Sequence, residues 1–437
     1  MTDTSSLGGP PTTLTGRGTL WAISAGHGVA DAYTAFLPAL LPLIALRFGM
    51  TEALLAALVA VFALASSLPG PALGHVADRL GHGRVAALSV ALSAATLSLL
   101  AVAPSMEALF ALVAVAGLGS AALHPSGSAL ARVGGTHPDT AIATFSAGGM
   151  LGYAVGPLAA TATLAIAGPE ALPWLAIPGL LVAASLFVLL PQDAVRPLAD
   201  TAMRKADTHL FSARMVALTA AGALAFLPFT AAVNGLPIWL GTDLGLAPGD
   251  RWIALTLTLF SLAGAFGGVV LGLATRVVAR RRVLVAALVL GAVPLQAILF
   301  LEPGGVAYAS ALVLAGALVY AATPLLVATA QELAPRAAAA AAGMVFGLSA
   351  GAAAVLYLGI GVLQQVIGVE AGLRIAFTTP LLAALIAWLA LRDFDAAPAD
   401  GRESLPRTLC RCLTAGPGGS ASEACCAAPT KRGCACA

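Results

Sequence analysis

Long apolar stretches, separated by short breaks of Gly, Pro or charged residues, occupy most of the chain from Leu20 to Leu391. A helix needs about 17–25 mostly apolar residues to cross a bilayer. Twelve stretches are long enough, and they predict transmembrane helices over residues 20–46, 53–73, 85–103, 108–130, 140–166, 171–190, 215–240, 252–273, 283–301, 306–328, 337–366 and 375–391. We therefore expect an all-α integral membrane protein.

Composition supports this class and argues against several others. Hydrophobic residues make up 59% of the chain and charged residues 10%, whereas soluble domains carry about 25% charged residues. Because so few charges cannot cover a water-exposed surface, lipid must surround most of this protein. The net charge of +2 argues against a nucleic-acid partner. The predicted folded part contains no phosphate loop or nucleophile motif, so we expect neither an enzyme nor a cofactor.

The basic residues predict how the chain is oriented. With a cytoplasmic N-terminus, nineteen of the 22 Lys and Arg residues fall on the cytoplasmic side, and only Arg47, Arg251 and Arg374 fall in outer loops. Cytoplasmic loops carry such an excess of positive charge. We therefore expect a multi-pass protein of the cell (inner) membrane with both termini in the cytoplasm.

The sequence divides into two related halves. The predicted organisation is a flexible N-terminus (1–19), a six-helix half (20–190), a cytoplasmic linker (191–214), a second six-helix half (215–391) and a disordered tail (392–437). Residues recur at a nearly constant offset of 195 to 199 positions, as in Pro42 and Pro237, Pro125 and Pro324, and Gly148 and Gly343. Such repeats place a binding site between the halves near the middle of the membrane.

A segment after the second predicted span combines glycines with an acidic and two basic residues. Its functional positions are Gly74, Asp78, Arg79, Gly81 and Arg84. The segment resembles the loop signature of the major facilitator superfamily, which implies two six-helix halves related by pseudo-two-fold symmetry and a secondary active transporter. In the family this loop stabilises one state of the access cycle. We expect a tight cytoplasmic turn, with Asp78 paired to arginines or to a helix N-terminus between the halves. The alternative is an ordinary basic turn with an incidental Asp.

The fifth predicted span carries regularly spaced glycines. Gly148, Gly152, Gly156 and Pro157 resemble the Gly-Pro motif of antiporters in the superfamily, and this resemblance implies export. Glycines four apart lie on one helix face and let two helices approach closely, so packing alone is the alternative explanation. The arginine of the related drug-antiporter motif is replaced here by Val113, which argues against a standard drug/proton mechanism.

The first and fourth spans resemble one branch of the superfamily more closely. Residues His27–Pro42 and Gly117–Pro125 are similar to the corresponding spans of fosmidomycin-resistance transporters. The resemblance covers the first half, while the second half matches in architecture.

Asp31 is the only acidic residue well inside a predicted span. A charge at that depth is costly and marks a functional candidate. His27 shares its helix face, one turn earlier, and His124 lies in the fourth span. We hypothesise that Asp31 is the proton-coupling carboxylate, with His27 and His124 as proton or substrate partners. A structural hydrogen-bond cluster is the alternative. Further cavity candidates are Tyr33, Asn234, Gln296, Tyr320, Thr323 and Tyr357.

No Lys or Arg lies within a predicted span. An anionic phosphonate would prefer such a group in its cavity, so a neutral or weakly lipophilic solute fits better. Protonated His27 or His124 remains a possible partner for an anion.

The cysteines all lie in the last 28 residues, as Cys410, Cys412, Cys425, Cys426, Cys434 and Cys436. Closely spaced thiolates are soft ligands for thiophilic ions. The leading hypothesis is therefore a monomeric, proton-coupled exporter of a metalloid, arsenite or antimonite first. One alternative is an exporter of a fosmidomycin-like or other small drug or metabolite, with the tail incidental. A second is a membrane-bound metal sensor. Three other interpretations of the tail are a frameshift product, a palmitoylated anchor and a regulatory metal site.

Overall fold

The structure is a computed structural model that describes residues 14–135, 138–192, 211–320, 322–334 and 338–392. Every regular element in these ranges is helical. The elements are α1 (Arg17–Thr34), α2 (Phe36–Phe48), α3 (Glu52–Ser67), α4 (Gly70–Leu80), α5 (His82–Ser98), η1 (Leu100–Val102), α6 (Met106–Gly134), α7 (Pro138–Ala167), η2 (Pro169–Leu175), α8 (Ala176–Leu189), α9 (Ala213–Thr242), α10 (Arg251–Ala274), α11 (Arg280–Ile298), α12 (Val306–Tyr320), α13 (Ala322–Leu333), α14 (Ala338–Gly343), the π-helical η5 (Met344–Leu348), α15 (Ser349–Ile367) and α16 (Val369–Ala390). The predicted all-α fold is confirmed.

The chain divides into two units, Met1–Arg392 and Asp393–Ala437. The second unit contains the cysteine-rich tail and lies outside the described residues. The predicted disorder of the tail and its six candidate metalloid ligands therefore stay predictions.

Each of the twelve predicted spans corresponds to one or more helices in the described ranges. In the described ranges, ten helices are long and apolar enough to cross a bilayer, and the bent pair formed by α3 and α4 brings the number to eleven. The remaining predicted span, residues 85–103, corresponds to α5 and η1. The 17-residue α5 ends at Ser98, before this 3-10 turn. Because α5 packs against α6 and α8, it is nevertheless part of the bundle.

A break at a proline divides the second predicted span. The second span consists of α3 and α4, whose axes differ by 51°. Pro69 lies at the junction and has no N–H to continue the helical ladder. Consequently Gly74 and Asp78 lie inside α4 and not in a turn, which corrects the predicted loop. The turn itself falls at Gly81, whose φ of +96° favours glycine.

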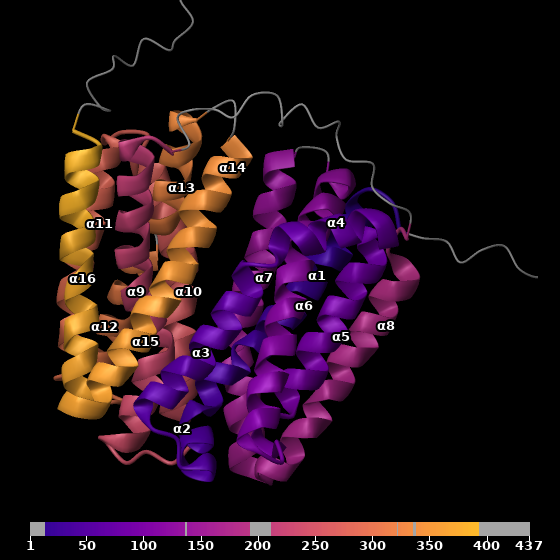
Figure 1. The fold of residues 1–437 in the computed structure, drawn as a ribbon, viewed down its shortest axis with the longest axis horizontal. Coiled ribbons are helices and arrows are strands. Elements are labelled where there is room, and N and C mark those ends of the chain that lie inside the picture. Colours follow the sequence, from indigo (N-terminus) through magenta and orange to yellow (C-terminus); the bar gives the residue numbers. More distant parts are fainter. Residues whose placement is uncertain (1–13, 136–137, 193–210, 321, 335–337, 393–437) are drawn as a thin grey trace, which may run out of the picture. The chain divides into compact units, whose positions relative to one another are not determined.

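The helices pack as two halves, α1–α8 and α9–α16 (Figure 1). Within the first half, α1 packs on α7 and α5 on α6; within the second, α9 packs on α16 and α10 on α12. Between the halves, α3 packs on α15 and α7 on α10. The second span of each half thus contacts the fifth span of the other, as pseudo-two-fold symmetry requires.

Close contacts between the halves lie toward the ends of the helices that carry Arg47 and Arg251. Gly361 of α15 packs on Ala56 and on the carbonyl of Glu52. Likewise, Gly241 packs on Pro42 and Gly249 on Ala165. The helices α4, α13 and α14, toward the opposite end, make their main contacts within their own halves. The halves are therefore joined at the predicted outer side.

Candidate functional site

The two polar residues predicted in the first span face each other in α1. His27 Nε2 lies 3.2 Å from Asp31 Oδ2, and the side chains are 6% and 20% exposed. Their spacing of four residues puts them on one helix face. We call His27 and Asp31 the proton pair, after the role hypothesised for them from the sequence. The helix ends three residues later, at Thr34, because Pro38 has no N–H to donate to the Thr34 carbonyl.

Helix α7 holds the other side of the His27 ring. Phe145 stacks on the imidazole at a centroid distance of 4.1 Å. Its carbonyl oxygen lies 2.8 Å from His27 Nδ1. Since a carbonyl oxygen only accepts hydrogen bonds, Nδ1 is the donor and carries a proton. Phe145 was not among the residues predicted from the sequence, because nothing in the local pattern links it to α1.

His124 of α6 completes the cluster. Its ring packs edge-on against His27 at a centroid distance of 5.1 Å, and it interacts electrostatically with Asp31. His124 is exposed, whereas His27 is buried. The three residues predicted together are therefore brought together, with His124 as the accessible member.

The glycines of the antiporter-like motif bring α7 into backbone contact with α1. Each meets a carbonyl group: Gly148 meets Ser24, Gly152 meets Gly28 and Gly156 meets Ala32. A side chain at any of these three positions would overlap the carbonyl oxygen. Pro157 follows on the same helix and is buried. This packing is what positions Phe145 over His27.

A cavity of about 200 Å³ lies between the two halves. We call it the central cavity. Its aromatic and polar lining residues are Phe62, Tyr153, Phe226, Phe229, Thr34, Ser66, Ser67, Thr230 and Asn234. None of the described residues that line it is charged. Tyr153, which lines the cavity, lies on α7, the helix whose Phe145 holds the His27 ring.

Two of the predicted cavity candidates lie on or beside this space, and a third, Thr323, follows one of them in the chain. Asn234 lines it and donates from Nδ2 to the Thr230 carbonyl at 2.8 Å. Tyr320 packs on Phe229 at a centroid distance of 5.0 Å and interacts electrostatically with Asp31. Thr323 is buried in α13, close behind Tyr320 in the chain.

Three other candidates point elsewhere. Tyr33 is buried in the first half and donates to the Leu175 carbonyl at 2.5 Å. Gln296 donates to the Arg374 carbonyl at 2.8 Å. Tyr357 is fully buried beside Gly235. None of these three lines the central cavity, because each belongs to the packing of its own half.

The signature segment around α4 makes its described contacts within the first half. Asp78 Oδ1 lies 3.2 Å from Nε2 of His82, the first residue of α5. Gly74 packs on Pro125, and Gly81 packs on the Gln192 carbonyl. The arginines Arg79 and Arg84 are exposed. In place of the expected pairing with an arginine or a helix terminus between the halves, Asp78 contacts a histidine of its own half.

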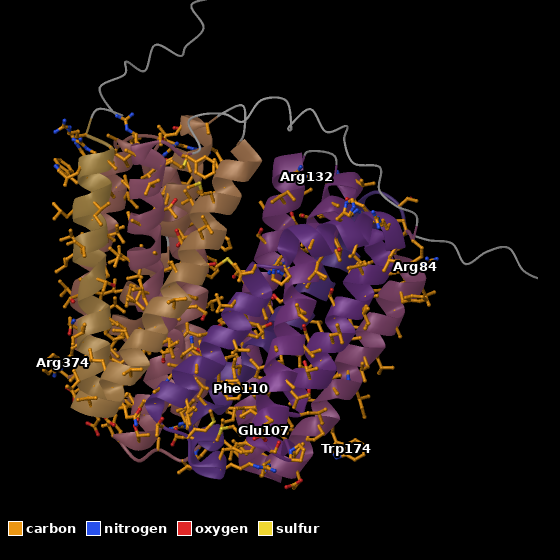
Figure 2. All side chains as sticks on the ribbon, in the orientation of Figure 1. Arg84, Glu107, Phe110, Arg132, Trp174 and Arg374 are labelled. Atoms are coloured by element: carbon orange, nitrogen blue, oxygen red, sulfur yellow. The ribbon has the colours of Figure 1, made fainter. Side chains whose placement is uncertain are left out.

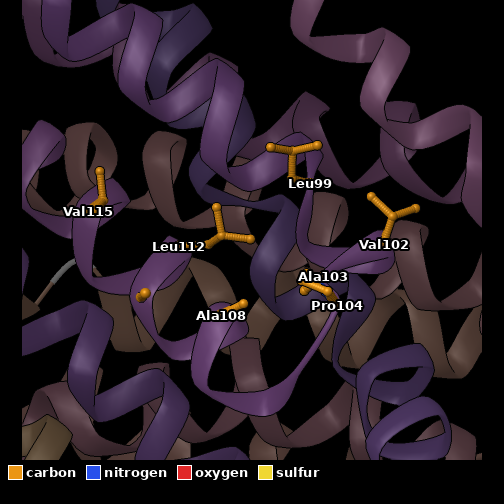
Figure 3. A pocket seen from close by; sticks show the side chains of 8 residues that line it. Leu99, Val102, Ala103, Pro104, Ala108, Leu112 and Val115 are labelled. Carbon is orange, nitrogen blue, oxygen red and sulfur yellow. The ribbon is translucent and has the colours of Figure 1, made fainter.

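A second hollow lies on the apolar surface of the first half. It has a volume of about 360 Å³ and is lined only by apolar residues of α6 and of the segment between α5 and α6, among them Leu99, Val102 and Leu112 (Figure 3). Without a polar group it has no means to orient a solute. Within the described ranges, no group of three or more His, Cys, Asp or Glu side chains is arranged to hold a metal ion.

Residues 23–358 match the Major Facilitator Superfamily. The chain therefore belongs to this superfamily of membrane transporters, and it is not an enzyme.

Two curated sequences and two solved structures are similar to it. The chain is 32% identical over 169 residues to the fosmidomycin resistance protein of Escherichia coli (strain K12), covering 38% of this chain and 41% of the relative. It is 33% identical over 135 residues to the uncharacterized MFS-type transporter YfnC of Bacillus subtilis (strain 168), covering 30% and 32%. Each match thus spans less than half of the curated relative.

Among structures, the nucleoside transporter NupG superposes with a TM-score of 0.72 at 12% identity, covering 85% of this chain and 99% of that one. A bacterial homolog to the human lysosomal transporter Spinster gives 0.69 at 15% identity, covering 86% and 97%. These superpositions confirm the predicted fold.

Proposed function

We propose that the protein is a proton-coupled exporter of a small toxic solute, in which the proton pair carries the proton and the central cavity carries the solute. The observation that supports this most directly is the setting of the His27 ring. Both of its nitrogens face oxygen atoms, the Phe145 carbonyl on one side and the Asp31 carboxylate on the other.

This setting calls for a proton between His27 and Asp31. Nδ1 donates to Phe145, so in a neutral imidazole Nε2 would present a lone pair to a carboxylate oxygen. That repulsion is removed when either the imidazole or the carboxyl group is protonated. Releasing the proton leaves a charge within a membrane span, at a cost of several kcal/mol. A change of conformation that stabilises this charge therefore accompanies release of the proton.

The solute is supported by the lining of the central cavity. Rings of Phe62, Phe226 and Phe229 provide apolar contact, and the hydroxyl and amide groups of Tyr153 and Asn234 provide hydrogen bonds. Such a lining fits a small organic solute without a fixed charge. The similarity to a fosmidomycin resistance protein supports export of a small drug. His124, exposed on α6 but outside the lining of the central cavity, is the candidate group to meet an anionic one.

A thiophilic metalloid, arsenite or antimonite, is the second candidate. It is supported by the six clustered cysteines of the tail and by the absence of Lys and Arg from the predicted spans. The proposed setting is the inner membrane, with both termini cytoplasmic and the protein monomeric. Arg132 and Arg374 lie toward opposite ends of the helices, as this orientation requires (Figure 2).

Transport into everted membrane vesicles tests the proposal. The vesicles come from a bacterial host lacking arsenite and fosmidomycin exporters, with and without the protein, and an acidic interior is imposed. We expect fosmidomycin accumulation that a protonophore abolishes. Accumulation that is insensitive to the protonophore would contradict proton coupling. Accumulation of arsenite but not fosmidomycin would favour the second candidate. Accumulation of neither, with the protein present in the membrane, would contradict both substrates and direct the next assays to uncharged drugs and to the sensor alternative.

A further inference from the structure

We infer that Gly149 of α7 is a positioning residue for the proton pair, an inference that rests on the proposed function. Its missing side chain gives His27 and Asp31 the space in which they meet. The surface of α7 at this residue closes over the contact that holds the proton.

The geometry around Gly149 sets it apart from its neighbours on α7. A Cβ atom here would lie 2.6 Å from Asp31 Oδ2 and 2.6 Å from His27 Nε2. These are the two atoms between which the proton is proposed to lie. A methyl group would therefore overlap both. Gly148 and Gly152, by contrast, meet only backbone atoms of α1.

The internal repeat provides an independent argument. At an offset of 195 positions, Gly148, Gly152 and Gly156 correspond to Gly343, Gly347 and Gly351, so glycine recurs at all three. Gly149 corresponds to Met344. At the same offset, His27 and Asp31 correspond to Gly222 and Phe226, neither of which is ionisable. In the second half Gly343, Gly347 and Gly351 meet nothing within 4 Å, so Met344 has the space that Gly149 lacks, and no ionisable pair lies at the corresponding positions.

The same stretch of α7 also contacts the solute site and the other half. One turn after Gly149, Tyr153 lines the central cavity. The next residue, Ala154, accepts a hydrogen bond at its carbonyl from Thr258 Oγ1 of α10, at 2.6 Å. One turn before Gly149, Phe145 binds His27. The glycines fix α7 to α1. A movement of α7 at the cavity or at its contact with α10 therefore also displaces the residues of α7 that contact His27 and Asp31.

A stability cycle on the purified full-length protein tests the geometry without depending on transport. We expect Gly149→Ala to lower the thermal unfolding temperature. The loss should disappear when His27→Ala and Asp31→Ala remove the side chains that the methyl group meets. The matched control is Gly359→Ala in α15, where a Cβ atom meets nothing within 4 Å. An equal loss with and without the proton pair would overturn the inference.

A titration tests the role in proton binding. Infrared spectra recorded across a pH series report the carboxyl band that Asp31→Asn removes. We expect Gly149→Ala to shift the midpoint of this band by about one pH unit, a tenfold change in proton affinity, and Gly359→Ala to leave it in place. An unchanged midpoint in a folded Gly149→Ala variant would overturn the positioning role. If Asp31→Asn leaves proton-driven transport intact, the proposed function is wrong. The stability cycle tests separately whether Gly149 packs against His27 and Asp31.

Discussion

Gly152 of α7 packs directly on the carbonyl group of Gly28 in α1, with no space for a Cβ atom between the two backbones. Close approach of this kind lets weak Cα–H···O contacts form between helices, and it is typical of helix pairs in membranes. The contact lies one turn beyond Gly148, and both hold α7 at the distance from which Phe145 reaches His27. The antiporter-like motif is thus, in this structure, the support of the proton pair.

Replacing Gly152 should destabilise the protein. Gly152→Ala places a methyl group on the Gly28 carbonyl, and overpacking of this kind costs about 1–3 kcal/mol. The measurement is thermal unfolding of the purified protein. Gly347→Ala is the control, since Gly347 is the repeat counterpart of Gly152 and a Cβ atom there meets nothing within 4 Å. Equal stability of the two variants would contradict the packing argument.

Removing the Asp31 charge should uncouple transport from the proton gradient. Asp31→Asn can no longer ionise, so we expect gradient-driven accumulation in everted vesicles to fall to the level of vesicles without the protein. Exchange of labelled for unlabelled solute needs no net proton movement and should remain.

Asp78 is the matched comparison, because it makes the same contact of 3.2 Å with a histidine four residues away. We expect Asp78→Asn to change the rate of transport but to preserve its sensitivity to a protonophore. Gradient-driven accumulation by Asp31→Asn would exclude this carboxylate from proton coupling.

The aromatic wall of the central cavity should determine affinity for the solute. Phe229→Ala removes a ring that lines the cavity. A loss of about 1.5 kcal/mol of apolar contact raises KM roughly tenfold. Initial rates of uptake over a range of solute concentrations measure this. Phe266→Ala is the control, because Phe266 is 64% exposed on α10. A KM unaffected by Phe229→Ala would place the solute elsewhere.

The contact between α15 and α3 should be necessary for the transport cycle. Gly361→Leu puts a large side chain against Ala56 and the Glu52 carbonyl, so the halves can no longer close on the predicted outer side. We expect loss of transport with normal membrane insertion, measured as solute accumulation per mole of inserted protein. Gly359→Leu, two residues earlier and in open space, should transport at the normal rate. Full activity of Gly361→Leu would show that this closure is not required.

The tail gives a prediction that separates the two solute candidates. Truncation after Phe394 removes all six cysteines. If the metalloid is the solute and the tail concentrates it near the inner mouth, truncation should lower arsenite resistance and leave fosmidomycin resistance unaffected. Resistance assays in the exporter-deficient host measure both. Equal arsenite resistance with and without the tail would remove the tail from the mechanism.

The local sequence pattern was sufficient to predict some features of this protein. The spans follow from apolar runs, because the length of a membrane helix is set by the bilayer and not by its neighbours. His27 and Asp31 could be paired from their spacing, since residues four apart always share a helix face. The glycines of α7 could be recognised from the same spacing.

Other features depended on how distant segments meet. Tyr33 lies only two residues after Asp31, yet its side chain points to η2 and not to the cavity. Phe145 and Gly149 lie more than a hundred residues from the pair that they contact, and the sequence contains no local signal of that contact. The bend at Pro69 moved Gly74 and Asp78 from the expected turn into α4.

The sequence by itself therefore determined the class of protein, the approximate spans and the three candidate site residues His27, Asp31 and His124. Only the tertiary structure decided which oxygen atoms face each nitrogen of His27, which aromatic rings face the cavity and which glycine makes room for the proton pair. The physical reason is that periodicity and length are properties of a single helix, whereas the crossing of α1 and α7 depends on which surfaces pack together without overlap.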